Sequence, residues 1–113
     1  MMRFYLERYD EGGDPKKREG KWISLPMDQD KLDKILEELG VVAEDGNFII
    51  NNLEDEQIKN LQPYLFVEDF SEMNNLASVL ETLDESEVEI INKHIEHHGE
   101  IDIPEFLEFI EKL

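Results

Sequence analysis

The sequence predicts an α+β fold, in which a small N-terminal three-stranded antiparallel sheet with a helix is followed by an acidic helical domain. Hydrophobic residues in three segments of the first half alternate with polar residues or form short runs, which is typical of strands. In the second half they recur every three or four residues, which is typical of amphipathic helices. We place the boundary near residue 63, which divides the chain into domains of residues 1–63 and 64–113.

Three strands are expected in the first half. Residues 2–9 alternate between apolar and polar side chains and predict a half-buried strand. Residues 10–20 contain glycine and proline and predict an exposed loop, whose basic triplet we interpret as a solvated loop tip. Residues 21–25 predict a second strand, in which Trp22 is either core or partly exposed scaffold, and residues 47–51 predict a third.

Two helical segments are also expected in the first half, one between the second and third strands and one after the third strand. The first has Asp28 or Asp30 as its N-cap, and Gly40 ends it in the left-handed conformation that glycine tolerates. The second is a short turn or helix over residues 54–61, which Pro63 breaks. The first half is thus expected to contain one full helix and one short helical turn besides its strands.

The second half predicts three helices, over about residues 71–83, 85–97 and 104–112. Each has an apolar stripe at helical spacing, and Pro104 suits the first turn of the last one. The candidate N-caps of the first two helices are Ser71, Asp84 and Ser86.

The charge of the chain is strongly negative and unevenly distributed. There are 29 acidic and 11 basic residues, and the formal net charge is −18. Residues 1–27 carry six bases and five acids, whereas residues 28–113 carry 24 acids and five bases. Hydrophobic residues make up 40% of the chain, so we do not interpret it as disordered. Such a field repels nucleic acid and anionic membranes and attracts a basic protein surface.

Several function classes find no support in the sequence. The absence of cysteine excludes disulfides, thiolate catalysis and cysteine-ligated zinc. No nucleophile elbow, glycine-rich phosphate loop or Ser/His/Asp order stands out. No apolar run is long enough to span a membrane, and the first residues do not form a signal peptide. We therefore expect a cytoplasmic protein that is not an enzyme and has no catalytic residues and no cofactor.

Three histidines near one helix end raise the question of a metal. His94 and His98 are four residues apart, share a helix face and could chelate a cation together with a nearby acid. The order of residues lacks the H-E-x-x-H pattern, however, and the helix dipole favours histidine near a C-terminus. We expect no metal site, and a metal-responsive module using His94 and His98 is kept as an alternative.

The segment of residues 94–105 also resembles the latter half of a calcium-binding EF-hand loop. Gly99, Asp102 and Glu105 stand at its sixth, ninth and twelfth positions. Calcium also needs oxygen ligands at the first and fifth positions, where this chain has histidines. We interpret the segment as a turn between two helices and expect no calcium binding.

The carboxylates themselves are the candidate functional feature. Lysine partners at i+4 are mostly missing from the last half of the chain. Duplex DNA presents regularly spaced phosphates to proteins that bind it through Lys and Arg, and a rigid fold with spaced carboxylates could occupy the same basic groove. A solvated coat that only aids solubility is the alternative. The candidate partner-binding residues are Asp30, Asp33, Glu37, Glu38, Glu68, Asp69, Glu72, Glu81, Asp84, Glu85, Glu87, Glu89 and Glu96.

Four motifs follow one another along the chain: MRFYLERY at residues 2–9, GKWISLPMD at 20–28, INNLE at 50–54 and SEMNNLASVLETLDE at 71–85. Taken in this order, they resemble the ArdA family of antirestriction proteins. The resemblance covers roughly residues 2–97. It implies a small α+β N-terminal domain followed by a helical acidic domain. It also implies a DNA mimic, carried by mobile elements, that occupies the DNA site of a type I restriction-modification enzyme.

The chain departs from the family pattern in two places. Asn52 stands where the pattern tends to have an acid. The sequence also ends where family members usually continue into a third domain that makes the dimer, so the oligomeric state and the length of DNA mimicked stay open. The expected partner is the basic DNA-binding groove of a type I restriction-modification enzyme or of another defence nuclease. The alternative is an acidic regulatory or partner-binding module without DNA mimicry.

Overall fold

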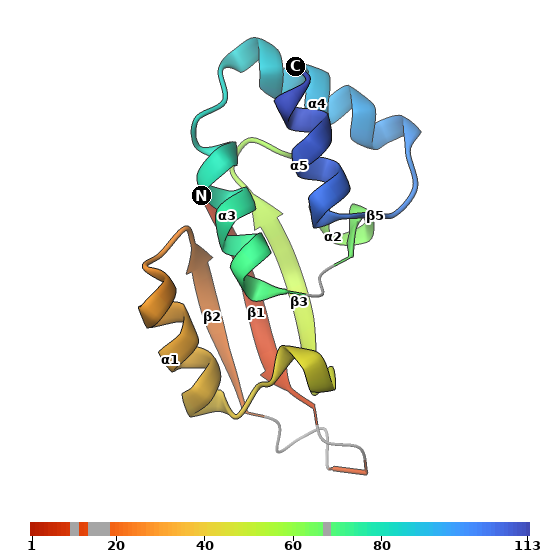
Figure 1. Cartoon of the computed structure of the whole chain (residues 1–113). Coiled ribbons are helices and arrows are strands. Elements are labelled where there is room, and N and C mark those ends of the chain that lie inside the picture. Colours follow the sequence, from red (N-terminus) through yellow and green to blue (C-terminus); the bar gives the residue numbers. More distant parts are fainter. Residues whose placement is uncertain (10–11, 14–18, 67–68) are drawn as a thin grey trace.

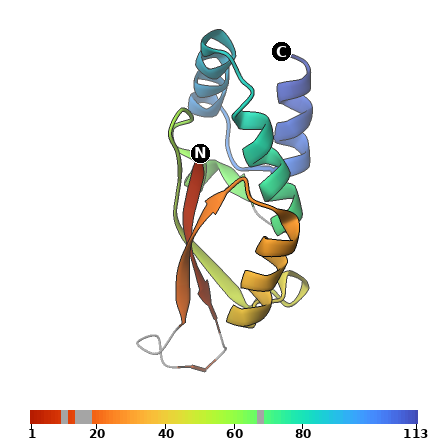
Figure 2. The ribbon, with the colours of Figure 1, turned by 90° about the vertical axis from the view of Figure 1, so that its left-hand side faces the viewer.

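In the computed structural model of the chain, three strands form an antiparallel sheet in the order β2-β1-β3 (Figure 1). The strands are β1 (Met2–Arg8), β2 (Gly20–Leu25) and β3 (Phe48–Asp55). Helices α1 and α3 lie on one side of this sheet, and α4 and α5 stand beyond one end of it (Figures 1 and 2). The predicted α+β fold class is confirmed.

A few segments are outside the description. Most of the predicted loop between the first two strands, with its basic triplet, lies there, as does Glu68. The structure describes residues 1–9, 12–13, 19–66 and 69–113, and of residues 63, 64 and 66 only the backbone.

The alternation read from the first strand is confirmed. Met2, Phe4 and Leu6 are fully buried under the helices. On β2, Ile23 and Leu25 are buried in register with the first two of them. Successive side chains of a strand point to opposite faces, so the other face of the sheet receives the polar and aromatic residues.

The third strand is longer than predicted, because a β-bulge interrupts its alternation. The pairing shifts by one residue between Arg3 and Tyr5 of β1, and Asn52 on β3 has a φ of 55°. Asparagine tolerates this left-handed conformation better than most residues, and the extra residue returns Leu53 to the buried face. The turn or helix predicted to open at residues 54–56 therefore starts later than predicted, since the strand continues to Asp55. The Asp55 carboxylate then accepts from the amides of Gln57 and Ile58, and the helix begins only at Leu61.

Helix α1 (Gln29–Leu39) has the predicted ends. Asp28 is its N-cap, and the carboxylate accepts a hydrogen bond from the amide of Asp30 at 2.9 Å. Gly40 ends the helix with a φ of 75°. The buried stripe includes Leu32 and Leu39, which pack toward the sheet.

A second, smaller sheet pairs the connection between the two halves with the segment before the last helix. Helix α2 (Leu61–Tyr64) is followed by β4 (Leu65–Phe66), which pairs in parallel with β5 (Ile101–Asp102). Pro63 lies within α2 rather than ending it, which the first turn of a helix permits because its amides need no helical partner.

The three helices predicted for the second half are present. Helix α3 spans Phe70–Leu80, α4 spans Glu85–His97 and α5 spans Ile103–Glu111. The prediction that Ser71 is the N-cap of α3 was wrong. Asp69 is the N-cap, and its carboxylate accepts a hydrogen bond from the Ser71 amide. Asp69 lies one position before the first helical residue, where its carboxylate can accept from an amide of the first turn, whereas Ser71 lies inside the helix.

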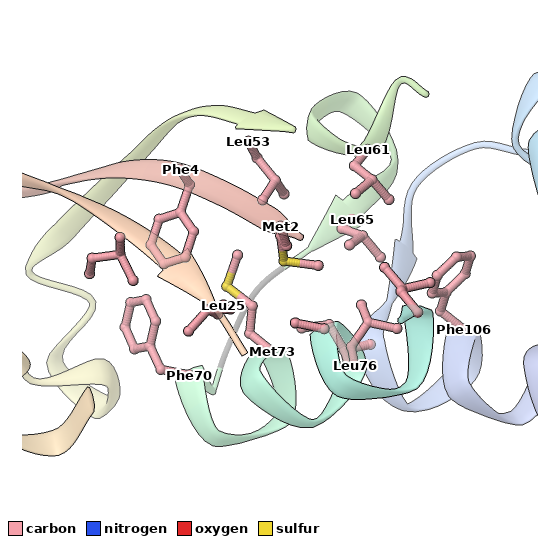
Figure 3. Close-up of a cluster of buried hydrophobic side chains, with 14 of the residues drawn as sticks. Met2, Phe4, Leu25, Leu53, Leu61, Leu65, Phe70, Met73, Leu76 and Phe106 are labelled. Atoms are coloured by element: carbon pink, nitrogen blue, oxygen red, sulfur yellow. The ribbon is translucent and has the colours of Figure 1, made fainter. Parts of the chain in front are cut away.

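One continuous cluster of buried side chains joins the two halves (Figure 3). Phe70 of α3 contacts Phe4 and Phe48 of the sheet, with ring centroids 6.4 and 4.9 Å apart. Buried Asn74 adds a polar tie, because its amide group accepts from the Met27 amide and donates to the Met27 carbonyl. The division near residue 63 stays a prediction, and limited proteolysis would test it.

Candidate acidic interaction surface

The described candidate carboxylates lie mainly at the surface. Glu72 and Glu87 are partly buried, and the others are exposed. They come from three elements, α1, the two ends of α3, and α4, so they form no single compact cluster. The exposed set is Asp30, Asp33, Glu37, Glu38, Asp69, Glu81, Asp84, Glu85, Glu89 and Glu96.

Helix α4 carries the most regular row. Glu85, Glu89 and Glu96 project from the side away from buried Ile91 and Ile95. At 1.5 Å of rise per residue, this row spans about 16 Å along the helix. Among the residues that the structure describes, Glu89 is the one member of this row with a cation partner, Lys93 at 3.2 Å, and this exposed pair screens one charge of the row. We call these three glutamates the α4 row.

The acids of α1 are more diluted. Asp30, Asp33 and Glu37 share an outer face, but Lys31 and Lys34 lie on the same helix and are also exposed. Asp33 additionally accepts a hydrogen bond from the Gln29 side chain at 2.9 Å. This helix therefore presents a weaker field than α4, in which Lys93 is the sole lysine.

Some candidate acids cap the N-termini of helices. Asp84 accepts from the Glu87 amide at 2.9 Å, and the Glu87 carboxylate accepts in return from the Asp84 amide at 3.1 Å. This capping box satisfies two amides of the first turn. The hydrogen bond from the Glu87 amide, followed by that from the Ser86 hydroxyl, lowers the pKa of Asp84 below its usual value. Asp69 plays the same capping role for α3, which sequence reasoning had not assigned to it.

His94 serves a packing role in the structure. The His94 ring stacks on Phe109 of α5 and on His98, with both centroid separations 3.8 Å. Burial, and secondarily His98, lowers the pKa of His94. Within the described part of the chain, no three potential ligands come together around a metal position. Asp102 caps α5 by accepting from the Glu105 amide, so its carboxylate is directed to the helix rather than into a cation loop.

These observations define a class: a small α+β protein whose exposed carboxylates greatly outnumber its cations. In the residues that the structure describes, no helix has the length and apolar character needed to cross a membrane.

Comparison with known families gives the class a more particular identity. The chain belongs to the ArdA family, described as "Antirestriction protein (ArdA)", which it matches over residues 5–112. The predicted resemblance is confirmed, and the match extends beyond residue 97 through α5. No curated protein and no solved structure matches the chain significantly.

Proposed function

We propose that this protein is a DNA mimic that inhibits a DNA-binding defence enzyme, first of all a type I restriction-modification enzyme, by occupying its DNA site. The family supports an antirestriction role. The choice of a type I enzyme follows what the resemblance to the family implies, and the mimicry is argued from the distribution of charge.

The linear charge density carries the proposal. The net charge is −18 and the longest dimension of the molecule is 44 Å, which gives about one net negative charge per 2.4 Å. B-form DNA carries one charge per about 1.7 Å of its axis. The protein thus offers roughly two-thirds of the charge of a duplex of equal length, on a scaffold that does not need to be bent or melted.

Inhibition by this means requires no chemistry from the inhibitor. Basic side chains that normally contact phosphates would contact carboxylates instead, and the long-range field would accelerate association. The protein would act stoichiometrically, as a binding partner and not as an enzyme, and added salt would weaken the complex because the exposed charges are screened.

The test is a titration of the protein against a type I restriction enzyme on unmodified DNA, with cleavage, methylation and DNA binding measured in parallel. We expect inhibition to be complete near one protein per DNA site and to be relieved by excess duplex DNA. If the protein binds the enzyme but DNA does not compete, the mimicry is refuted and a partner-binding module without mimicry takes its place. If it displaces DNA from no defence nuclease, the proposed function is wrong.

A further inference from the structure

The sheet has one face that no described helix covers. Helices α1 and α3 both lie against the opposite face (Figure 2). On the uncovered face, Arg3 and Tyr5 of β1 lie beside Ser24 and Trp22 of β2, their partners in the strand register. We call these four residues, together with Glu54 of β3, the open sheet face.

The side chains of the open sheet face hold one another in place. The Arg3 guanidinium lies 4.4 Å from the centre of the Trp22 ring and 2.8 Å from a Glu54 carboxylate oxygen. The Tyr5 ring lies 5.5 Å from that of Trp22 and occupies the space where a Cβ at Gly20 would stand. Even so, 46% of Trp22 is exposed. A large indole thus packs against Arg3 and Tyr5 and still presents much of its surface to solvent.

A pocket adjoins these residues at one end of the sheet. Its volume is about 470 Å³, and it is lined by Met1, Arg3, Ser24, Glu54, Asp55 and Glu56. The Arg3 guanidinium is matched by Glu54, and the Met1 amine lies within 4 Å of Asp55, Glu56 and Glu81. Carboxylates thus exceed cations around the pocket, and a cationic group is the complementary occupant.

One acidic residue links the pocket to the start of α4. Glu81, at the end of α3, reaches the Met1 amine that lines the pocket, and Asp84 and Glu85 follow at the start of α4. The chain therefore connects the pocket to the first residue of the α4 row over four positions, from Glu81 to Glu85.

We propose that the open sheet face is a second contact surface for the same enzyme, where a lysine or arginine side chain of that enzyme enters the pocket and adjoining apolar surface packs on Trp22. This inference rests on the proposed function and adds an anchor to it. A protein is the occupant that the observations favour, because the net charge of −18 repels nucleic acid and anionic lipid. Clustered Trp, Tyr and Arg are also the residues that most often dominate binding energy at protein interfaces.

The first test separates the anchor from the charge. Trp22→Ala is compared with Val42→Ala, whose side chain is similarly exposed at 47% but lies outside the sheet. Enzyme affinity is measured at several salt concentrations, with melting temperatures recorded for each variant. We expect Trp22→Ala to lose about ten-fold or more in affinity while the salt dependence keeps its slope. Equal affinities for the two variants would overturn the inference.

A second pair of variants avoids any loss of packing. Ser24→Arg places a cation in the pocket, whereas Ser78→Arg adds the same charge to an exposed site on α3, away from the open sheet face. We expect the first variant to weaken binding by several times more than the second. Equal weakening would show that only net charge counts and would refute the anchor while leaving the mimicry intact. Failure of the wild-type protein to bind the enzyme would instead refute the proposed function.

Discussion

The sheet and helix α4 differ in how their charged side chains are paired. On the strands, Arg3 is stacked on Trp22 and ion-paired with Glu54, and residues 1–27 carry nearly balanced charge. On α4, three glutamates form a row with one lysine partner. The strand charges are therefore fixed by specific neighbours, whereas the helix charges are held only by the backbone that carries them.

This difference separates two kinds of acid that the sequence does not distinguish. Some carboxylates are required for the local structure, as in the capping box of α4, and others contribute only their charge. A single substitution of a carboxylate of the first kind should lower the stability of the protein. Carboxylates of the second kind should matter only when several are replaced together, and their replacement should weaken binding to the partner rather than lower stability.

The largest effect is expected from removing the charges at the end of α3 and along α4 together, including that of the capping residue Asp84. Replacing Glu81, Glu85, Glu89 and Glu96 by Gln and Asp84 by Asn should weaken enzyme binding about a hundred-fold or more and flatten its salt dependence, since each exposed ion pair contributes up to about five-fold. Asparagine is as good an N-cap as aspartate, so α4 should persist. Inhibition titrations with circular dichroism check both results, and unchanged inhibition by a folded variant would contradict the collective mechanism.

The sequence predicted the fold where local rules decide it. Alternation placed β1, a capping acid and a final glycine bounded α1, and helical spacing found the buried stripes of α3 to α5. It missed what depends on distant pairing. The bulge at Asn52 extends β3 because β1 supplies its register, and β5 exists only because β4 lies beside it. Neither partner is visible in a local window of sequence.

The candidate site was predictable as a composition but not as a geometry. The excess of acids is evident from counting, and the spacing of the α4 row follows from helical periodicity. Which acids cap helices depends on the exact starting residue, as the exchange of Ser71 for Asp69 illustrates. The exposure of Trp22 and the pocket beside it depend on which face the helices cover, and sequence could not assign that.

The next effect concerns an acid of the structural kind. Asp84→Ala should lower the melting temperature by several degrees, because the amides of the first turn of α4 lose their acceptor. Glu85→Ala, one position further and without a capping contact, serves as the control and should leave the melting temperature nearly unchanged. Equal melting temperatures would mean that the capping box does not contribute.

The same group should give a pH signature. The pKa of Asp84 is lowered in the folded protein, so its contribution to stability is present above the unfolded value of 3.8 and is lost as pH falls through the lower folded value. Asp84→Asn keeps the cap without the titration. The stability difference between the wild type and this variant should therefore shrink on acidification below about pH 4, and a constant difference would contradict the assignment.

A smaller pH effect is expected where α4 packs on α5. Burial lowers the pKa of His94 below its usual 6.5, so the unfolded chain binds the proton more readily and stability falls as pH drops through 6.5 toward the folded pKa. His94→Phe keeps a ring against Phe109 but cannot titrate. Thermal melts between pH 8 and about pH 5 should show this loss in the wild type and in the exposed-site control His97→Gln, but not in His94→Phe.

The smallest effect is expected from single members of the α4 row. Glu85→Gln or Glu89→Gln alone should change inhibition by less than about five-fold, because each charge is exposed and screened. Glu89→Gln should have the smaller effect of the two, since Lys93 already neutralises part of the Glu89 charge. The Lys93 ammonium that this substitution leaves unpaired is exposed and screened, so at physiological salt it repels a basic groove only weakly. An active site would behave in the opposite way, with one residue abolishing activity and its neighbours hardly mattering. If either single substitution abolished inhibition while circular dichroism and melting temperature stayed the same, a specific contact would have to replace the collective surface as the mechanism.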